Sequence, residues 1–129
     1  MKPRGSKDNR PVNLELTTIK FPITALASIS HRVTGVLLFV SSVLLVWALD
    51  ASLASEESFN QLVKLLSSTG GKVILWAFLV IFSYHALAGI RHLIMDVGIG
   101  EDFKGGALGA RILFVASALA AVAWGIVLW

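Results

Sequence analysis

An uninterrupted apolar segment with a histidine inside it constrains this chain more than any other feature. From Val73 to Ile90 the sequence has eighteen residues without a formal charge, apart from His85, which can take up a proton. At ~1.5 Å per residue, an α-helix of that length crosses most of a ~30 Å hydrocarbon layer. The segment therefore predicts a transmembrane helix, and an ionisable group at membrane depth is a functional candidate because burying it in lipid is costly.

Two further apolar segments repeat this signal. Residues 33–49 and 112–129 hold seventeen and eighteen residues without a formal charge. The 129-residue chain is 56% hydrophobic and only 15% charged, which leaves less polar surface than a water-soluble domain of this size needs. We expect an all-α membrane protein with one membrane-anchor domain, an N-terminal segment at 1–21 and transmembrane helices at about 22–49, 72–96 and 106–129.

The chain contains no cysteine. It can therefore build neither a disulfide framework nor a cysteine-held zinc or iron–sulfur site. A redox centre held by this chain would have to use histidine.

The lysines and arginines are divided unevenly among the predicted loops. Six precede the uncharged segment 33–49 and three lie between the segments 73–90 and 112–129, whereas only Lys64 and Lys72 lie between the first and second segments. The positive-inside rule places the N-terminus and the second loop in the cytoplasm and the C-terminus in the periplasm. The N-terminal segment has neither a secretory h-region nor the acid-free pattern of a transit peptide, which favours a bacterial cytoplasmic (inner) membrane. No basic patch interleaved with aromatic residues indicates nucleic-acid binding.

The external loop contains a short amphipathic pattern. Ser58 and Gln61 resemble a capping box, and Gly70 and Gly71 predict the end of the helix. The apolar residues that share one face of this predicted interfacial helix are Phe59, Leu62, Val63 and Leu66.

A small polar niche is predicted in the first turns of the first transmembrane helix. Ser28 and Arg32 are four residues apart and share a face, with His31 beside them. Gly35 removes side-chain bulk there and lets a flat group or another helix approach. A hydroxyl and a fixed cation could hydrogen-bond a quinone carbonyl and stabilise the anion formed on reduction. Alternatively, Arg32 only extends to the lipid headgroups.

His85 is the candidate ligand of a haem iron. A neutral imidazole beside a gap in an apolar helix, here cleared by Gly89, suits an axial ligand, although a histidine hydrogen-bonded to a neighbouring helix has the same signature. His92 is seven residues away, or ~10 Å along the helix, and cannot share the iron with His85. His31 is expected a turn or two nearer the cytoplasmic rim, so we expect the second ligand from another chain. His31 and Arg32, with Arg91 or His92, could bind haem propionates.

The second loop carries three carboxylates, at Asp96, Glu101 and Asp102. We expect them to be solvated loop charges. An alternative is that Asp96 pairs with Arg91 or His92, or relays protons inward.

Two motifs together resemble a known family. The stretch RPVNLELTTIKFPITALASISHRVTG, followed by HALAGIRHLIMDVG, resembles the cytochrome b membrane-anchor subunit of succinate dehydrogenase, the larger of two anchors in bacterial respiratory complex II. The motifs SxxHRxxG and HxxxGxRHxxxDxG are specific in combination, and the similarity covers essentially the whole chain. The resemblance implies a four-subunit complex in which a flavoprotein and an iron–sulfur subunit are held to the membrane by two anchors. These anchors share one b-type haem and a ubiquinone site near the cytoplasmic side.

The same resemblance implies residue roles. His85 would be an axial ligand of haem iron, with its counterpart on the smaller anchor subunit, and His31 would contact a haem propionate. Ser28 and Arg32 would line the ubiquinone pocket. The chain would be a non-autonomous subunit of the enzyme with no catalytic residue of its own. A haem-free structural anchor, the related anchor of a fumarate reductase, and a small transporter with His85 as a proton relay are the alternatives.

Overall fold

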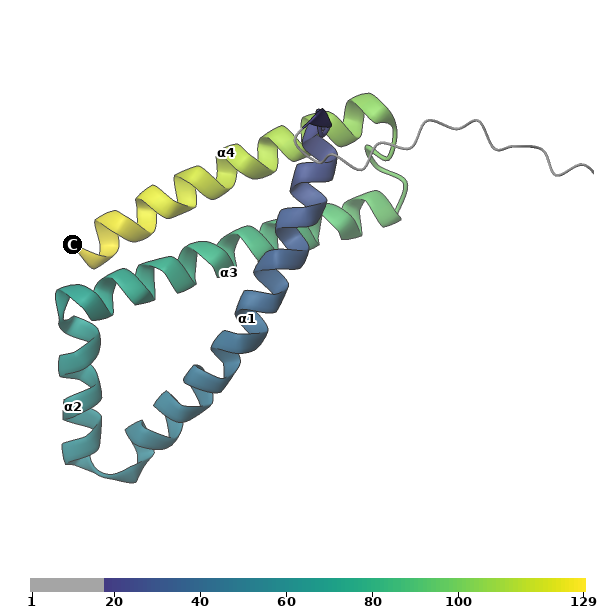
Figure 1. Cartoon of the computed structure of the whole chain (residues 1–129). Helices are drawn as coiled ribbons and strands as arrows, with labels where there is room; N and C mark the ends of the chain where they lie inside the picture. The colour runs from purple at the N-terminus through teal and green to yellow at the C-terminus, as the bar shows by residue number, and fades with distance from the viewer. Residues whose placement is uncertain (1–17) are drawn as a thin grey trace, which may run out of the picture.

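The computed structural model describes residues 18–129, and all four of its long elements in that part of the chain are α-helices (Figure 1). They are α1 (Ile23–Ala54), α2 (Glu56–Ser67), α3 (Thr69–Asp96) and α4 (Phe103–Leu128). Helices α1, α3 and α4 are long and apolar enough to cross a membrane, with mean hydropathies of 2.2, 2.1 and 2.1. The predicted all-α architecture with three spans is therefore confirmed. Most of the predicted segment 1–21 lies outside the described residues.

Helix α1 is longer than its apolar run predicts. It continues past Asp50 to Ala54, five residues beyond the expected end at Leu49. The extra turn consists of residues compatible with a helix, and the Ser52 hydroxyl donates to the Leu49 carbonyl at 2.7 Å. Pro22, where the helix was expected to begin, is the N-cap residue, and its carbonyl accepts hydrogen bonds from the amides of Ala25 and Leu26.

The predicted signals for the start and end of α2 are wrong. The helix begins at Glu56, and Ser55 caps it by accepting a hydrogen bond from the Ser58 amide at 3.1 Å. It ends at Ser67 rather than at the two glycines, which lie in the first turn of α3. Ser55 and Ser68 set the starts of α2 and α3, because the hydroxyl of each accepts a hydrogen bond from a backbone amide that would be unpaired in the first turn. A Cβ at Gly71 would collide with the Leu65 carbonyl oxygen, so this tight corner requires glycine.

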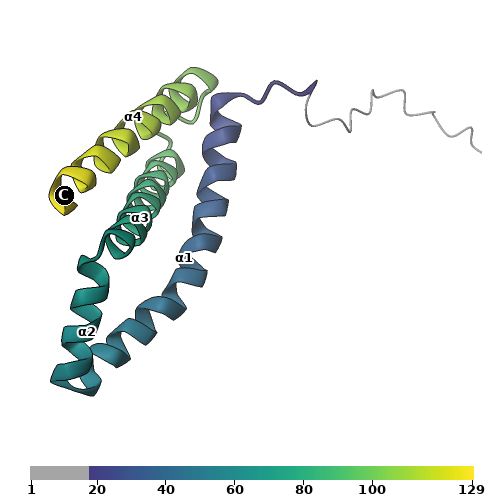
Figure 2. The same ribbon diagram turned by 60° about the vertical axis from the view of Figure 1, so that its left-hand side comes forward.

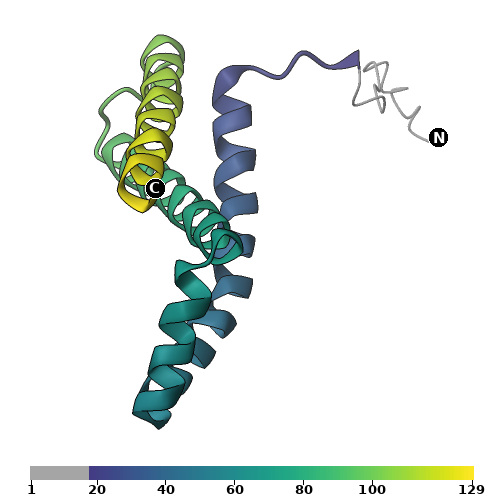
Figure 3. The ribbon, with the colours of Figure 1, turned by 90° about the vertical axis from the view of Figure 1, so that its left-hand side faces the viewer.

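The helices form an open arrangement. Helices α3 and α4 run side by side in opposite directions, and α1 packs against α3 near the end that leads into α4 (Figures 1 and 2). From this crossing α1 and α3 diverge (Figure 1), and α2 joins the end of α1 to the start of α3 (Figure 3). The polar residues of the first turns of α1 therefore lie opposite the second half of α3.

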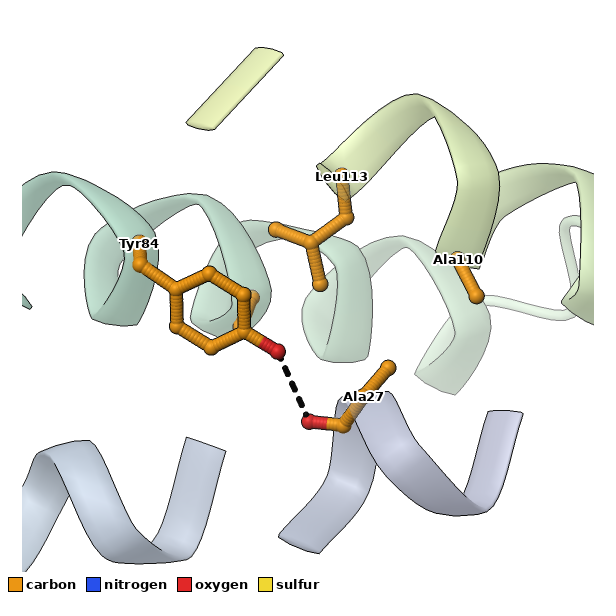
Figure 4. Packing of buried hydrophobic residues seen from close by; sticks show 5 residues of the cluster. Ala27, Tyr84, Ala110 and Leu113 are labelled. Atoms are coloured by element: carbon orange, nitrogen blue, oxygen red, sulfur yellow. Dashed lines mark hydrogen bonds between the residues drawn. The ribbon is translucent and has the colours of Figure 1, made fainter. Parts of the chain in front are cut away.

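The core is small and lies where the three long helices meet (Figure 4). Its buried members are Ala27, Tyr84, Ala88, Ala110 and Leu113. Alanines at the contact let the backbones approach closely, and the Tyr84 hydroxyl donates to the Ala27 carbonyl at 3.1 Å. Little of each span is buried inside the chain, so the remaining apolar surface must be covered by lipid or by other subunits.

Candidate functional site

Three imidazoles gather where α1 crosses α3. The ring of His31 on α1 stacks on that of His85 on α3, with centroids 4.2 Å apart and an interplanar angle of 28°. The ring of His92, two turns further along α3, lies 5.1 Å from that of His31, with an interplanar angle of 38°. The crossing therefore brings together two predicted site residues and adds His92 to them.

A glycine on each helix faces this contact, and Gly35 is the one that makes the close approach possible. A Cβ at Gly35 of α1 would lie 3.1 Å from Cε1 of His85, which is tighter than ordinary contact. A Cβ at Gly89 of α3 would lie 3.9 Å from Nε2 of His31. Each glycine thus faces the imidazole of the opposite helix. The expectation that Gly35 admits another helix is confirmed, and what enters is the His85 ring.

The hydrogen bonds of His85 define which ring nitrogen carries the proton. Nδ1 lies 3.2 Å from the His31 carbonyl oxygen and 3.2 Å from the Thr34 hydroxyl. The Thr34 hydroxyl has one hydrogen, and the carbonyls of Ser30 and His31, both at 2.9 Å, accept it. The His31 carbonyl can only accept, so its contact with Nδ1 assigns the donating N–H to Nδ1, with the Thr34 hydroxyl as a second acceptor. In this tautomer the lone pair of Nε2 is left free.

The free nitrogens of His85 and His31 have different surroundings. Nε2 of His85 makes no hydrogen bond to residues 18–129 and is not among their buried unpaired atoms, so it reaches the surface. Nε2 of His31 is buried between the helices and unpaired within the same residues. A ligand from outside the chain can therefore reach His85 directly, whereas His31 Nε2 is enclosed at the crossing.

The expected offset in depth between His31 and His85 is wrong. Counting residues from the helix ends treats both helices as parallel to the membrane normal, whereas α1 crosses α3 at an angle (Figure 1). Stacked rings nevertheless cannot clasp one iron, because ring-nitrogen lone pairs lie in the ring planes and these two planes lie nearly parallel, one over the other. In the described part of the chain, no group of three or more possible ligand side chains could hold a metal ion.

Ser28 and Arg32 lie one turn apart on α1, next to the histidine crossing. Ser28 is partly buried and Arg32 is exposed. Neither side chain hydrogen-bonds to another residue between 18 and 129, and they do not bond to each other. Their polar groups are therefore free to meet a ligand or a partner chain beside the first turns of α1.

The Arg91 side chain points away from the three histidines and lies against α4. Its Nη2 donates to the Gly106 carbonyl at 3.1 Å, and a Cβ at Gly109 would lie 3.3 Å from its Nε. No ion pair joins Asp96 to Arg91 or His92 in the described structure. Asp102, expected to be only a solvated charge, caps α4 by accepting from the Gly105 amide at 2.8 Å.

Thr34 is the site residue that sequence reasoning missed. It lies three residues after His31, within the motif that carries the other site residues, and it reaches His85 across the helix interface. Its position one turn from His31 was the available signal, because residues three apart share a helix face. The stacking of His92 was also missed, since it depends on the angle at which the helices cross.

The comparisons with known proteins show the family of this chain. Residues 6–125 match the family described as succinate dehydrogenase/fumarate reductase transmembrane subunit. The chain belongs to this family. It is 42% identical to the succinate dehydrogenase cytochrome b556 subunit of Coxiella burnetii over 121 residues, which cover 93% of this chain and 97% of that protein. The subunit of the same name from Paracoccus denitrificans is 32% identical over 117 residues, covering 91% and 90%. The cytochrome b560 subunit of Reclinomonas americana is 32% identical over 122 residues, covering 90% and 85%.

Family membership and the three apolar helices together identify a multi-pass membrane protein. The family resemblance predicted from the two motifs is confirmed by these matches.

Proposed function

We propose that this chain is the larger membrane-anchor cytochrome b subunit of a bacterial succinate dehydrogenase. It shares a b-type haem with the smaller anchor and helps to form the site where ubiquinone accepts electrons from succinate through the iron–sulfur subunit. The observation that carries the proposal is the state of His85, whose Nδ1 donates within the chain while Nε2 presents a lone pair to the surface.

The residues at the crossing fit a haem. Metal-bound histidines commonly donate their second ring N–H to a carbonyl, which fixes the tautomer and the ring orientation, and His31 provides that carbonyl here. Haem b, when bound, supplies a one-electron carrier between the iron–sulfur subunit and the quinone. Nε2 of His31 is buried and has no partner among residues 18–129, so a haem propionate would pair with it only where haem binding opens the crossing.

A second ligand of the haem iron would come from the smaller anchor. Among the three histidines of this chain, His31 is stacked on His85 and His92 is seven residues further along the same helix, so neither would share an iron with His85. The uncovered apolar faces of α1 and α3 provide the surface that a partner anchor would bury.

Ser28 and Arg32 bind the ubiquinone headgroup. The serine hydroxyl and the guanidinium can donate hydrogen bonds to a quinone carbonyl, and the cation favours negative charge developing on that oxygen. With the N-terminus in the cytoplasm, as the positive-inside rule predicts, this edge faces the flavoprotein and iron–sulfur subunits. The relatives are named for succinate dehydrogenase, which favours succinate oxidation over fumarate reduction.

The test is to purify the intact complex in mild detergent and record its reduced-minus-oxidised absorption spectrum. We expect a b-type haem in the wild-type complex and loss or alteration of its spectrum in His85→Ala. Ser42→Ala is the control, because this exposed hydroxyl of α1 donates only to the Phe39 carbonyl of its own helix. A wild-type complex without haem, or an unchanged spectrum in His85→Ala, would overturn the proposal.

A further inference from the structure

A groove between α3 and α4 lies on the side of α3 that faces away from His85. Its α3 wall includes Leu87, Ile90 and Ile94, which at 100° per residue are rotated by about 200°, 140° and 180° from His85. The groove has a volume of about 400 Å³. Its walls are apolar and uncovered, with exposed fractions of 53% at Ile90, 44% at Ile94, 57% at Leu108 and 59% at Ile112.

Arg91 is the charged residue that lines this groove. Only its Nη2 is hydrogen-bonded, to the Gly106 carbonyl, while Nε is buried and unpaired within the described residues. Nη1 makes no hydrogen bond to residues 18–129 and is not buried among them, so it reaches the surface. Gly109 allows the guanidinium to lie against the α4 backbone.

The Arg91 guanidinium has no carboxylate partner in the described residues, so we expect an anion from outside them to pair with it. Arginine stays protonated in proteins, and a charge in an apolar environment is costly unless it is paired. No carboxylate between residues 18 and 129 forms an ion pair with Arg91. Arg91 lies five residues before the end of α3, or ~7.5 Å along the helix, close to where headgroups begin.

We propose that this groove binds one anionic phospholipid from the cytoplasmic leaflet. The phosphate pairs with Arg91, and an acyl chain runs from there toward the membrane interior along Leu87, Ile112 and Ala116. A cation and an apolar trough that continues from it into the membrane match the two parts of such a lipid, and basic pockets between transmembrane helices at the cytoplasmic side suit anionic headgroups. The choice of lipid over a partner subunit rests on the proposed function, which puts the smaller anchor on the opposite, His85 side of α3.

The test uses the intact complex, stripped of lipid by detergent washing and then mixed with phosphatidylglycerol or with phosphatidylcholine of the same acyl chains. Bound lipid is counted by native mass spectrometry. We expect the wild-type complex to retain one phosphatidylglycerol in preference to phosphatidylcholine by about fivefold, and Arg91→Gln to abolish that preference. Arg111→Gln, which removes an equivalent exposed charge from α4 outside the groove, should keep the preference.

Equal retention of the two lipids by the wild-type complex, or an unchanged preference in Arg91→Gln, would overturn the inference. If Arg91→Gln does not assemble, Ile112→Trp replaces it, because the indole fills the groove without changing a charge. That variant should lose the bound phosphatidylglycerol, and full retention would count against the groove. The haem spectrum of the same wild-type sample tests the proposed function separately, since lipid retention does not depend on a chromophore.

Discussion

The polar side chains on the two sides of α3 differ in the partners that they find within the chain. On the side facing α1, the proton of His85 Nδ1 is satisfied within the chain, and the imidazole presents one free lone pair. On the side facing α4, Arg91 is a permanent cation with one hydrogen bond to a carbonyl and no carboxylate partner in the described residues. The first arrangement orients a neutral ligand, whereas the second leaves a charge to be compensated from outside. A polar residue in a membrane helix therefore has to be interpreted from its partners as well as its depth.

The largest expected effect concerns the α1 side. Arg32→Leu should lower ubiquinone reduction by the purified complex about 100-fold, or ~2.7 kcal/mol, because it removes the cation that stabilises the reduced quinone oxygen. Ser28→Ala should cost about tenfold, since only a neutral donor is lost. Ubiquinone reduction is measured beside succinate oxidation by an artificial dye, which should be retained. Equal loss of both activities would show that the complex fails to assemble and would contradict a quinone-binding role.

Gly35→Val tests whether the close contact on the α1 side supports the bound haem. The new side chain would collide with His85, and overpacking of this kind costs about 1–3 kcal/mol. We expect lower haem content per complex and a lower melting temperature by differential scanning fluorimetry. Gly70→Ala is the control, because nothing lies within 4 Å of a Cβ at that position. Normal haem content in Gly35→Val would show that the ring has room to move.

Tyr84→Phe should have a smaller effect, because it removes one buried hydrogen bond between α3 and α1 while keeping the ring. The loss of a hydroxyl and the unpaired Ala27 carbonyl should cost about 1 kcal/mol of stability. Thermal unfolding of the complex measures the change. The haem spectrum should stay unchanged, because Tyr84 does not contact the His85 ring nitrogens; an altered spectrum would show that this bond positions the histidine.

Thr34→Val should have the smallest effect of the four. It removes one of the two partners of His85 Nδ1, while the His31 carbonyl still accepts the proton. We expect haem to be retained, with a stability loss of about 0.5 kcal/mol and a small shift in the haem midpoint potential. Redox titration of the purified complex measures that shift. Complete loss of haem would mean that the hydroxyl, rather than the carbonyl, orients the imidazole.

The three spanning helices were predictable because a segment that crosses lipid must be long and almost free of charged residues. Long runs without charge, such as residues 73–90, satisfy that demand only as helices whose backbone groups are bonded internally. The residues of the candidate site were also predictable one by one, since His85, His31 and Arg32 are polar groups in or beside apolar segments. Helix ends were less predictable, because Ser55 and Ser68 cap their helices where other residues carried the apparent signals.

Sequence alone therefore determined that this chain is a three-span membrane protein of the succinate dehydrogenase/fumarate reductase family, with ionisable groups at membrane depth. Only the tertiary structure decided that His31 stacks on His85, that Thr34 reaches the same ring and that Arg91 faces α4. The physical reason is that composition sets whether a helix enters the membrane, whereas the crossing angle and the glycine contacts set which side chains meet. Those two quantities depend on pairs of helices, and no single segment encodes them.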